Sequence, residues 1–124
     1  MPNFITKDNV LTSCRVDKKD KKVNNNPVTI PDGVKAIGEG AFFDSGKNGS
    51  TGCSRIIKIE IPNSVTEIGD SAFEGCKSLT EIKISNSVKT IGDLAFSGCI
   101  SLTEIEIPNK VTKIGDSTFL NCIS

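Results

Sequence analysis

The stretch IPNSVTEIGDSAFEGCKSLTEIK occupies residues 61–83, and the same pattern begins again at Ile84 and once more at Ile107. Each of these copies starts 23 residues after the previous one, and an imperfect earlier copy starts at Ile30. Self-similarity at a fixed period of a few tens of residues marks a repeat architecture. The sequence therefore predicts a fold made by stacking one small unit several times.

Each unit contains two short extended pieces. The segment Leu79-x-x-Ile82-x-Ile84 alternates like a strand, so Ile82 and Ile84 should point to one face. Val88-x-x-Ile91 predicts the second extended piece. One coil cannot bury its own apolar side, so the coils must stack on one another.

A single helical turn is predicted to complete each coil. Gly92 ends the second extended piece, and Asp93 is placed to accept backbone N–H bonds as the N-cap of a turn that carries Ala95 and Phe96. The recurring apolar positions form the predicted core. In the second copy they are Ile61, Val65, Ile68, Ala72, Phe73, Cys76, Leu79 and Ile82.

The pattern L-T-x-I-x-I-P-x-x-V-T-x-I-G-x-x-A-F-x-x-C resembles the BspA-like class of leucine-rich repeat over residues 28–124. Three positions depart from it, because Ser85 replaces the corner proline, Thr118 the alanine and Asn121 the glycine before cysteine. The resemblance implies an α/β repeat, a short right-handed leucine-rich-repeat solenoid that is strand-dominated with short helical turns. It also implies a non-enzymatic protein-recognition or adhesion module of a surface or secreted protein, with host or matrix proteins as partners.

The chain divides into residues 1–27, which do not follow the repeat, and about four repeats in residues 28–124, of which the last is incomplete. Residues 4–12 predict a hairpin around an Asp-Asn turn. Such a hairpin would cap the apolar flank of the first coil. The charged stretch 15–22 is interpreted as a solvated loop, and a patch for anionic ligands is the alternative.

The first repeat carries a polar, glycine-rich insertion at residues 43–52, which predicts an exposed loop. Insertions in repeat proteins sometimes bind partners, so Lys47 and Asn48 are candidate binding residues. The sequence around Lys47 lacks the spacing of a phosphate-binding loop. Asn48-Gly49-Ser50 matches a glycosylation sequon, a short pattern that often occurs by chance.

Four cysteines, Cys53, Cys76, Cys99 and Cys122, occupy one repeat position, and Cys14 is left over. Stacked neighbours point the same way, whereas a disulfide needs opposed Cβ vectors. Zinc sites use closely spaced ligand pairs, which the sequence lacks. The chain has no histidine for a Cys–His nucleophile. We therefore expect free, buried thiols and no metal site.

The acidic and hydroxyl residues do not predict an enzyme. Asp70, Asp93 and Asp116 recur in equivalent positions, whereas acid–base catalysis needs carboxylates in different environments. No cofactor is predicted. Fifteen basic and 15 acidic residues balance, which argues against nucleic-acid or anionic-membrane partners. No apolar run is long enough to insert into a membrane.

Charged side chains alternate with the isoleucines of the first extended pieces and are predicted to face outward as the partner-binding surface. These candidates are Lys58, Glu60, Glu81, Lys83, Glu104 and Glu106. The row Glu60–Lys83–Glu106 alternates in sign, so neighbouring strands should attract by about 0.2–1 kcal/mol per pair. The other row, Lys58–Glu81–Glu104, ends with two glutamates in neighbouring coils, whose like charges repel. The alternative role is to keep the sheet soluble and in register.

The two ends of the sequence leave alternatives open. The start lacks the apolar segment of a signal peptide, so the chain is either intracellular or exported with its signal removed. No strand follows Cys122, so we expect residues 104–107 to form an unpaired edge and Phe119 and Leu120 to be poorly covered. The chain would then be a fragment of a longer protein, or self-associate through its C-terminal coil. An intracellular assembly scaffold is the alternative function.

Overall fold

The computed structural model of the protein describes residues 3–15, 28–44 and 53–122. The candidate loop residues Lys47 and Asn48 lie outside these ranges. Most of the predicted loop at 15–22 and of the insertion lies outside them as well.

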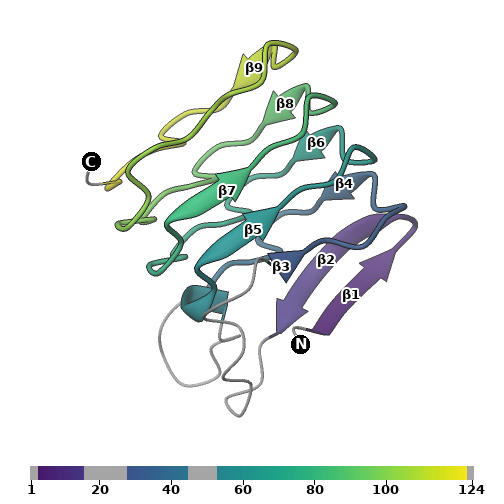
Figure 1. The fold of residues 1–124 in the computed structure, drawn as a ribbon, viewed down its shortest axis with the longest axis horizontal. Coiled ribbons are helices and arrows are strands. Elements are labelled where there is room, and N and C mark those ends of the chain that lie inside the picture. Colours follow the sequence, from purple (N-terminus) through teal and green to yellow (C-terminus); the bar gives the residue numbers. More distant parts are fainter. Residues whose placement is uncertain (1–2, 16–27, 45–52, 123–124) are drawn as a thin grey trace.

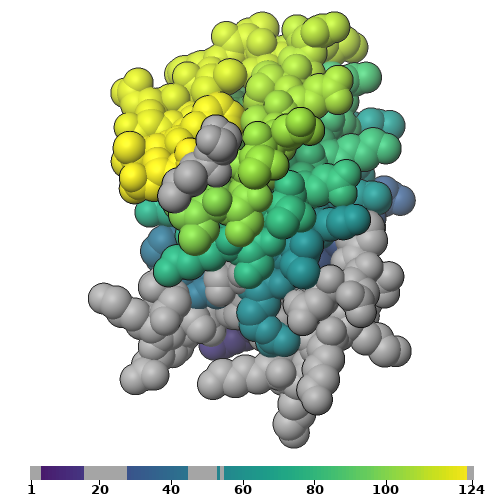
Figure 2. Space-filling model, turned by 60° about the vertical axis from the view of Figure 1, so that its left-hand side comes forward, coloured from purple at the N-terminus to yellow at the C-terminus, as the bar shows by residue number. Residues whose placement is uncertain are grey.

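The described residues form a stack of coils with two sheets (Figure 1). One sheet has the strand order β1-β2-β4-β6-β8-β9 and the other the order β3-β5-β7. The strands are β1 Asn3–Lys7, β2 Val10–Arg15, β3 Val28–Thr29, β4 Ala36–Ile37, β5 Lys58–Glu60, β6 Glu67–Ile68, β7 Glu81–Lys83, β8 Thr90–Ile91 and β9 Lys113–Ile114. The coils stack in chain order, from teal through green to yellow in Figure 2.

Parallel pairing places equivalent repeat positions side by side. Ile59 of β5 pairs with Ile82 of β7, and Ile68 of β6 pairs with Ile91 of β8. These four side chains are buried, while the charged neighbours of Ile59 and Ile82 are exposed. A shift by one residue would expose the isoleucines, so the apolar pattern fixes the register.

A hairpin covers the first coil, over the stretch where the sequence predicts one. Strands β1 and β2 pair antiparallel through a turn at Asp8 and Asn9, whose φ angles are 53° and 66°. Aspartate and asparagine tolerate this left-handed region better than other side chains. Strand β2 then pairs parallel with β4, with Leu11 beside Ile37. The hairpin therefore supplies the neighbour that the first coil would otherwise lack.

A column of phenylalanine rings runs through the core. Phe42, Phe73 and Phe96 are completely buried. The ring centroids of Phe42 and Phe73 are 4.8 Å apart, and those of Phe73 and Phe96 are 5.3 Å apart, with the rings stacked. Phe119 continues the column at 5.8 Å but remains 37% exposed. The predicted inward-facing position is confirmed for the three inner rings.

The predicted helical turns are wrong. Ser71, Leu94 and Ser117 have φ angles of 55°, 57° and 53°, which are incompatible with a right-handed helical turn. The backbone bonds between coils instead: Phe73 N donates to Ala95 O at 2.8 Å. Within the described ranges the one helical segment is the 3₁₀ helix η2, Cys53–Arg55, and no helix is long and apolar enough to cross a membrane.

Asp70 and Asp93 each cap the next coil and not their own turn, which corrects the predicted N-cap role. Asp93 N donates to Asp70 Oδ1 at 2.8 Å, and Asp116 N donates to Asp93 Oδ1 at 2.7 Å. Each carboxylate thus joins two coils through a charge-assisted hydrogen bond.

We expect Asp93→Ala to lower the free energy of unfolding by about 1 kcal/mol, because the N–H of Asp116 loses its acceptor. Denaturant melts measure the change. Asp116→Ala is the matched control, since no described backbone N–H donates to its carboxylate. An equal loss in both variants would contradict the role between coils.

The three departures from the repeat pattern fit the fold. Ser85 Oγ donates to Pro62 O at 3.0 Å, and the buried Thr118 donates through Oγ1 to Gly115 O at 2.6 Å. Asn121 has a φ of 61°, a left-handed value that asparagine tolerates better than most side chains. Each substitution therefore keeps the local geometry by a bond or conformation of its own.

The C-terminal edge differs from the prediction. Residues 104–107 form no strand, so the smaller sheet ends at β7. The pairing stops where Glu104 would lie beside Glu81, and like charges directly opposite destabilise strand pairs. Phe119 and Leu120 are 37% and 49% exposed, so the predicted poor cover of these side chains is confirmed.

Candidate partner-binding face

A wide groove of about 1780 Å³ lies along the sheet β3-β5-β7. Side chains from four successive segments line it, from Thr29 in the first to Pro108 in the last. Because parallel stacking repeats each outward position, the groove runs across the coils and along no single one. We call this surface the strand-face groove.

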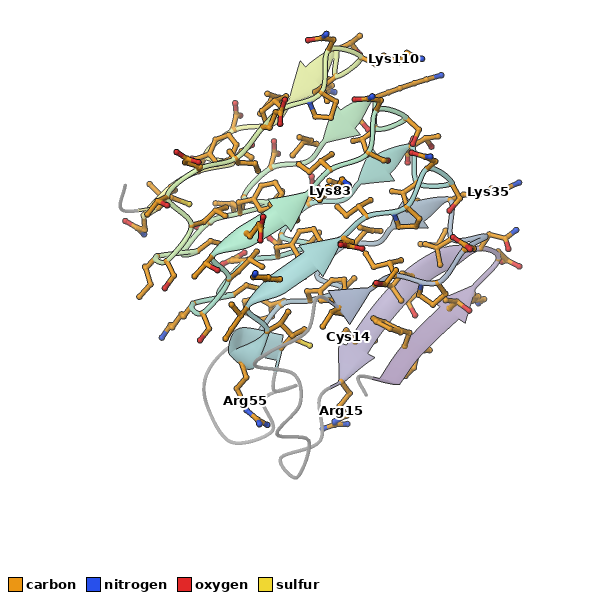
Figure 3. All side chains as sticks on the ribbon, viewed as in Figure 1. Cys14, Arg15, Lys35, Arg55, Lys83 and Lys110 are labelled. Atoms are coloured by element: carbon orange, nitrogen blue, oxygen red, sulfur yellow. The ribbon has the colours of Figure 1, made fainter. Side chains whose placement is uncertain are left out.

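The six predicted face residues all line the strand-face groove and are all exposed. Lys83 lies on β7 in Figure 3. The alternation of charged residues with buried isoleucines is what brings the six together. The candidate loop residues Lys47 and Asn48 fall outside the described ranges, so their position relative to this face stays a prediction.

Asp32 also lines the groove, and the sequence analysis missed it. It follows the strand at the corner, in the repeat position that Asn63 and Asn86 occupy in later coils. Those two asparagines line the groove as well. The repeated polar residue at the corner was therefore the sequence pattern that could have identified Asp32.

The charges of neighbouring strands partly compensate one another. Lys58 and Glu81 pair in register, and Lys58 Nζ lies 3.5 Å from Glu81 Oε2. Their side chains are 48% and 66% exposed, so this ion pair adds little stability. Glu60 pairs in register with Lys83. Among the described residues of this face, the close ion pair thus lies in the row Lys58–Glu81–Glu104, while the alternating row brings the opposite charges of Glu60 and Lys83 into register.

The cysteines form the predicted buried column. Cys53, Cys76 and Cys99 are completely buried, and all five cysteines are free thiols. Cys76 Sγ donates to Phe42 O at 3.4 Å, and Cys99 Sγ donates to Phe73 O at 3.2 Å. Within the part of the chain that the structure describes, no three His, Cys, Asp or Glu residues are grouped as a metal site.

Burial suppresses ionisation of these thiols. It raises the pKa of Cys99 to about 12, and the pKa of Cys76 is raised well above its ordinary value for the same reason. The pKa of Cys14 is raised by its hydrogen bond with Cys53 and by burial. The thiolate is the nucleophile and the metal ligand, so these thiols are poorly suited to either task at neutral pH.

We expect Cys53, Cys76 and Cys99 to resist a thiol reagent in the folded protein and to react after unfolding. The half-buried Cys122 should react first. Raised pKa values keep Cys76 and Cys99 protonated, so the native rate for Cys99 should stay low until the pH approaches 12. Counting labelled residues by mass spectrometry at neutral pH measures this. Rapid native labelling of all five, or no free thiol after unfolding, would refute it.

The comparison with protein families identifies the repeat. A model of the BspA type leucine rich repeat region, described as six copies, matches residues 46–124. No curated protein matches the chain. The repeat recognised in the sequence is therefore shown by an independent family pattern.

Solved leucine-rich repeat structures resemble the chain. A leucine-rich repeat protein from Bacteroides ovatus is 32% identical, with a TM-score of 0.72 over 98% of this chain and 31% of that one. A leucine rich cell surface protein from Faecalibacterium prausnitzii is 37% identical, with a TM-score of 0.68 over 78% of this chain and 24% of that one. A T. pallidum leucine-rich repeat protein is 25% identical, with a TM-score of 0.71 over 95% of this chain and 51% of that one.

The chain thus spans about half or less of the length of each of these proteins. Its own fold is of the leucine-rich-repeat type, dominated by strands. The matched family region covers more than half of the sequence. The chain belongs to the BspA-type leucine-rich repeat family.

Proposed function

We propose that this chain is a non-catalytic protein-recognition module of a surface or secreted protein, and that it binds host or matrix proteins through the strand-face groove. The groove carries the proposal, because it gathers six exposed charged side chains from three coils on one continuous surface. Faces of this kind, made by stacking repeats, serve as extended binding surfaces. The repeated parallel register between coils also supports the proposed solenoid.

The comparisons support the proposed location. One similar structure is that of a leucine rich cell surface protein. The name applies to that protein alone. The similarity of the two chains supports the proposal that this chain is exported as well. Fold alone does not set function, so the groove must be tested directly.

The test is binding to a panel of purified matrix proteins by surface plasmon resonance. A double variant, Glu81→Ser with Lys83→Ser, removes one charge of each sign from the groove. The matched control, Glu67→Ser with Lys89→Ser, makes the same change outside the groove. We expect the groove variant to lose about tenfold in affinity for the bound protein and the control to keep it. Equal binding by both variants, or no binding to any matrix protein, would overturn the proposal.

A second candidate function, assembly through the last coil, rests on its apolar surface. Ile114, Phe119 and Leu120 are 46%, 37% and 49% exposed. The equivalent positions of the previous coil, Ile91, Phe96 and the polar Ser97, are all buried. A second copy of the chain could cover them in the same manner.

We expect light scattering to show dimers that dissociate on dilution if this assembly forms. Leu120→Lys should shift the chain to monomer, since a charge in an apolar contact is costly. Ile5→Lys is the control, because Ile5 is 59% exposed at the opposite end of the stack. A monomer at every concentration would exclude assembly by this surface.

A further inference from the structure

We infer that the partner of the strand-face groove is a basic, extended protein segment, an inference that rests on the proposed function and specifies its ligand. Three features of the groove point to such a partner: its negative charge, the position of its uncompensated carboxylates and its polar lining. Each is independent of the family match.

The groove is negatively charged although the chain is neutral. Its described lining includes the carboxylates of Asp32, Glu60, Glu81, Glu104 and Glu106. The basic lining residues are Lys58 and Lys83, so the lining has a net charge of −3 at neutral pH. The whole sequence has 15 basic and 15 acidic residues. The excess negative charge on this face is therefore balanced by positive charge elsewhere on the chain.

Several cations lie outside the groove. Arg15 and Arg55 lie at the end of the stack near the N-terminus, and Lys35 and Lys110 project from the edge formed by the corners (Figure 3). None of these four residues lines the groove. The separation of charge gives the molecule a negative face that can attract a positive partner over the screening length.

The uncompensated carboxylates lie at the two ends of the groove. Lys58 is paired with Glu81, and Lys83 is in register with Glu60, so the middle of the groove is close to neutral. Asp32 in the first segment has Asn63 at the equivalent position of the next coil, and Glu104 in the last segment has Glu81 at its equivalent position. Glu106 has Lys83 at its equivalent position, but Glu60 pairs with that lysine as well. Both ends of the groove therefore keep uncompensated negative charge. Attraction is thus strongest at two separated points.

The spacing of these points suits an extended chain. Neighbouring parallel strands lie about 4.8 Å apart, so the first and last of the four segments are on the order of 14 Å apart across the coils. Asp32 occupies the repeat position of Asn109, three residues past Glu106, so these two carboxylates are also about 10 Å apart along the coil and on the order of 17 Å apart in all. An extended peptide rises about 3.3 Å per residue, so residues about six positions apart span this distance and point to the same side. A segment with cations at that spacing can reach both negative ends at once.

The rest of the lining favours a polar partner. Thr29, Thr80, Ser85 and Thr103 contribute hydroxyls, and no aromatic residue is among the described lining. Aromatic anchors usually dominate the affinity of apolar protein interfaces. Affinity in this groove must therefore come largely from charge complementarity, which makes it sensitive to salt.

The experiment uses two synthetic peptides and fluorescence anisotropy. One peptide carries lysines at both ends with threonine and serine between them, and the other has glutamate in place of each lysine. The groove variant combines Asp32→Asn, Glu104→Gln and Glu106→Gln. The control combines Asp8→Asn, Glu39→Gln and Glu67→Gln, which changes net charge equally but outside the groove. Circular dichroism melts verify that both variants fold.

We expect the lysine peptide to bind the wild-type chain and the control, and the groove variant to bind about tenfold more weakly. Raising the ionic strength from about 0.01 M to about 0.15 M should weaken wild-type binding, since the screening length falls from about 30 Å to about 8 Å. The glutamate peptide should not bind. Equal losses in both variants, stronger binding of the glutamate peptide, or no binding of either peptide would overturn the inference.

The two proposals fail in different ways. Suppose that the groove recognises a partner that is not basic. The double variant Glu81→Ser with Lys83→Ser then loses affinity for a matrix protein, while the lysine peptide does not bind the wild-type chain. That result overturns the basic partner and keeps protein recognition. If the lysine peptide binds in the groove but no matrix protein does, the charge preference holds and the proposed matrix partners are wrong.

Discussion

Replacing Phe73 by alanine should lower the free energy of unfolding by about 3–5 kcal/mol. The ring is completely buried and stacks on Phe42 at 4.8 Å and on Phe96 at 5.3 Å. Removing it leaves a cavity between two coils whose backbones are joined by hydrogen bonds, so collapse into the space is restricted. Phe96→Ala should cost a similar amount for the same reason.

Phe119→Ala is the matched control for this prediction. The ring occupies the same repeat position, but among the described residues it stacks on Phe96 alone, and it is 37% exposed. We expect a loss of about 1–2 kcal/mol, because less apolar surface leaves the core. Denaturant melts with comparable m-values measure all three variants. Losses below about 1 kcal/mol for both Phe73→Ala and Phe96→Ala would contradict a column of core rings.

The core could be predicted from the sequence because the repeat identifies it several times. A position that is apolar in every copy, such as that of Ile59 and Ile82, must face the neighbouring coils. The outward charges between these isoleucines follow from the same alternation. The six candidate face residues were therefore found from pattern alone, although their use in binding remains a proposal.

The turns could not be predicted because the decisive bonds join different coils. A segment such as 93–98 looks locally like a capped helical turn, with Asp93 in place and Phe96 inward. Three of its backbone N–H groups, those of Leu94, Phe96 and Gly98, instead donate to the next coil, as Phe96 N does to Thr118 O at 2.9 Å. Tertiary hydrogen bonds override local helix propensity here.

The end of the smaller sheet was also beyond the sequence pattern. Residues 104–107 repeat the strand motif, yet pairing stops at β7. The like-charge step between Glu81 and Glu104 was visible in the sequence. Whether such a step merely weakens a pair or ends it depends on the balance with backbone bonding, which periodicity does not reveal. Asp32 was missed because it lies at a corner and not on a strand.

Replacing Gly92 by alanine should lower the free energy of unfolding by about 3 kcal/mol, because the added methyl group has no space. A Cβ built on Gly92 would lie 2.5 Å from Asp70 N and 2.6 Å from Gly69 C. Both atoms belong to the backbone of the previous coil, and Gly92 N is bonded to Ile68 O at 2.8 Å. The coils would have to separate, which would also strain the bond between Asp93 N and Asp70 Oδ1.

The control separates loss of space from loss of backbone freedom. Gly33 has a φ of 94° but nothing within 4 Å of an added Cβ. Gly33→Ala should therefore cost only the strain of a left-handed residue, about 1–2 kcal/mol. Thermal and denaturant melts of both variants, with hydrogen exchange at the amides of β6 and β8, measure the difference. If Gly92→Ala costs no more than Gly33→Ala and leaves exchange at those amides unchanged, close contact between the coils at this glycine does not limit stability.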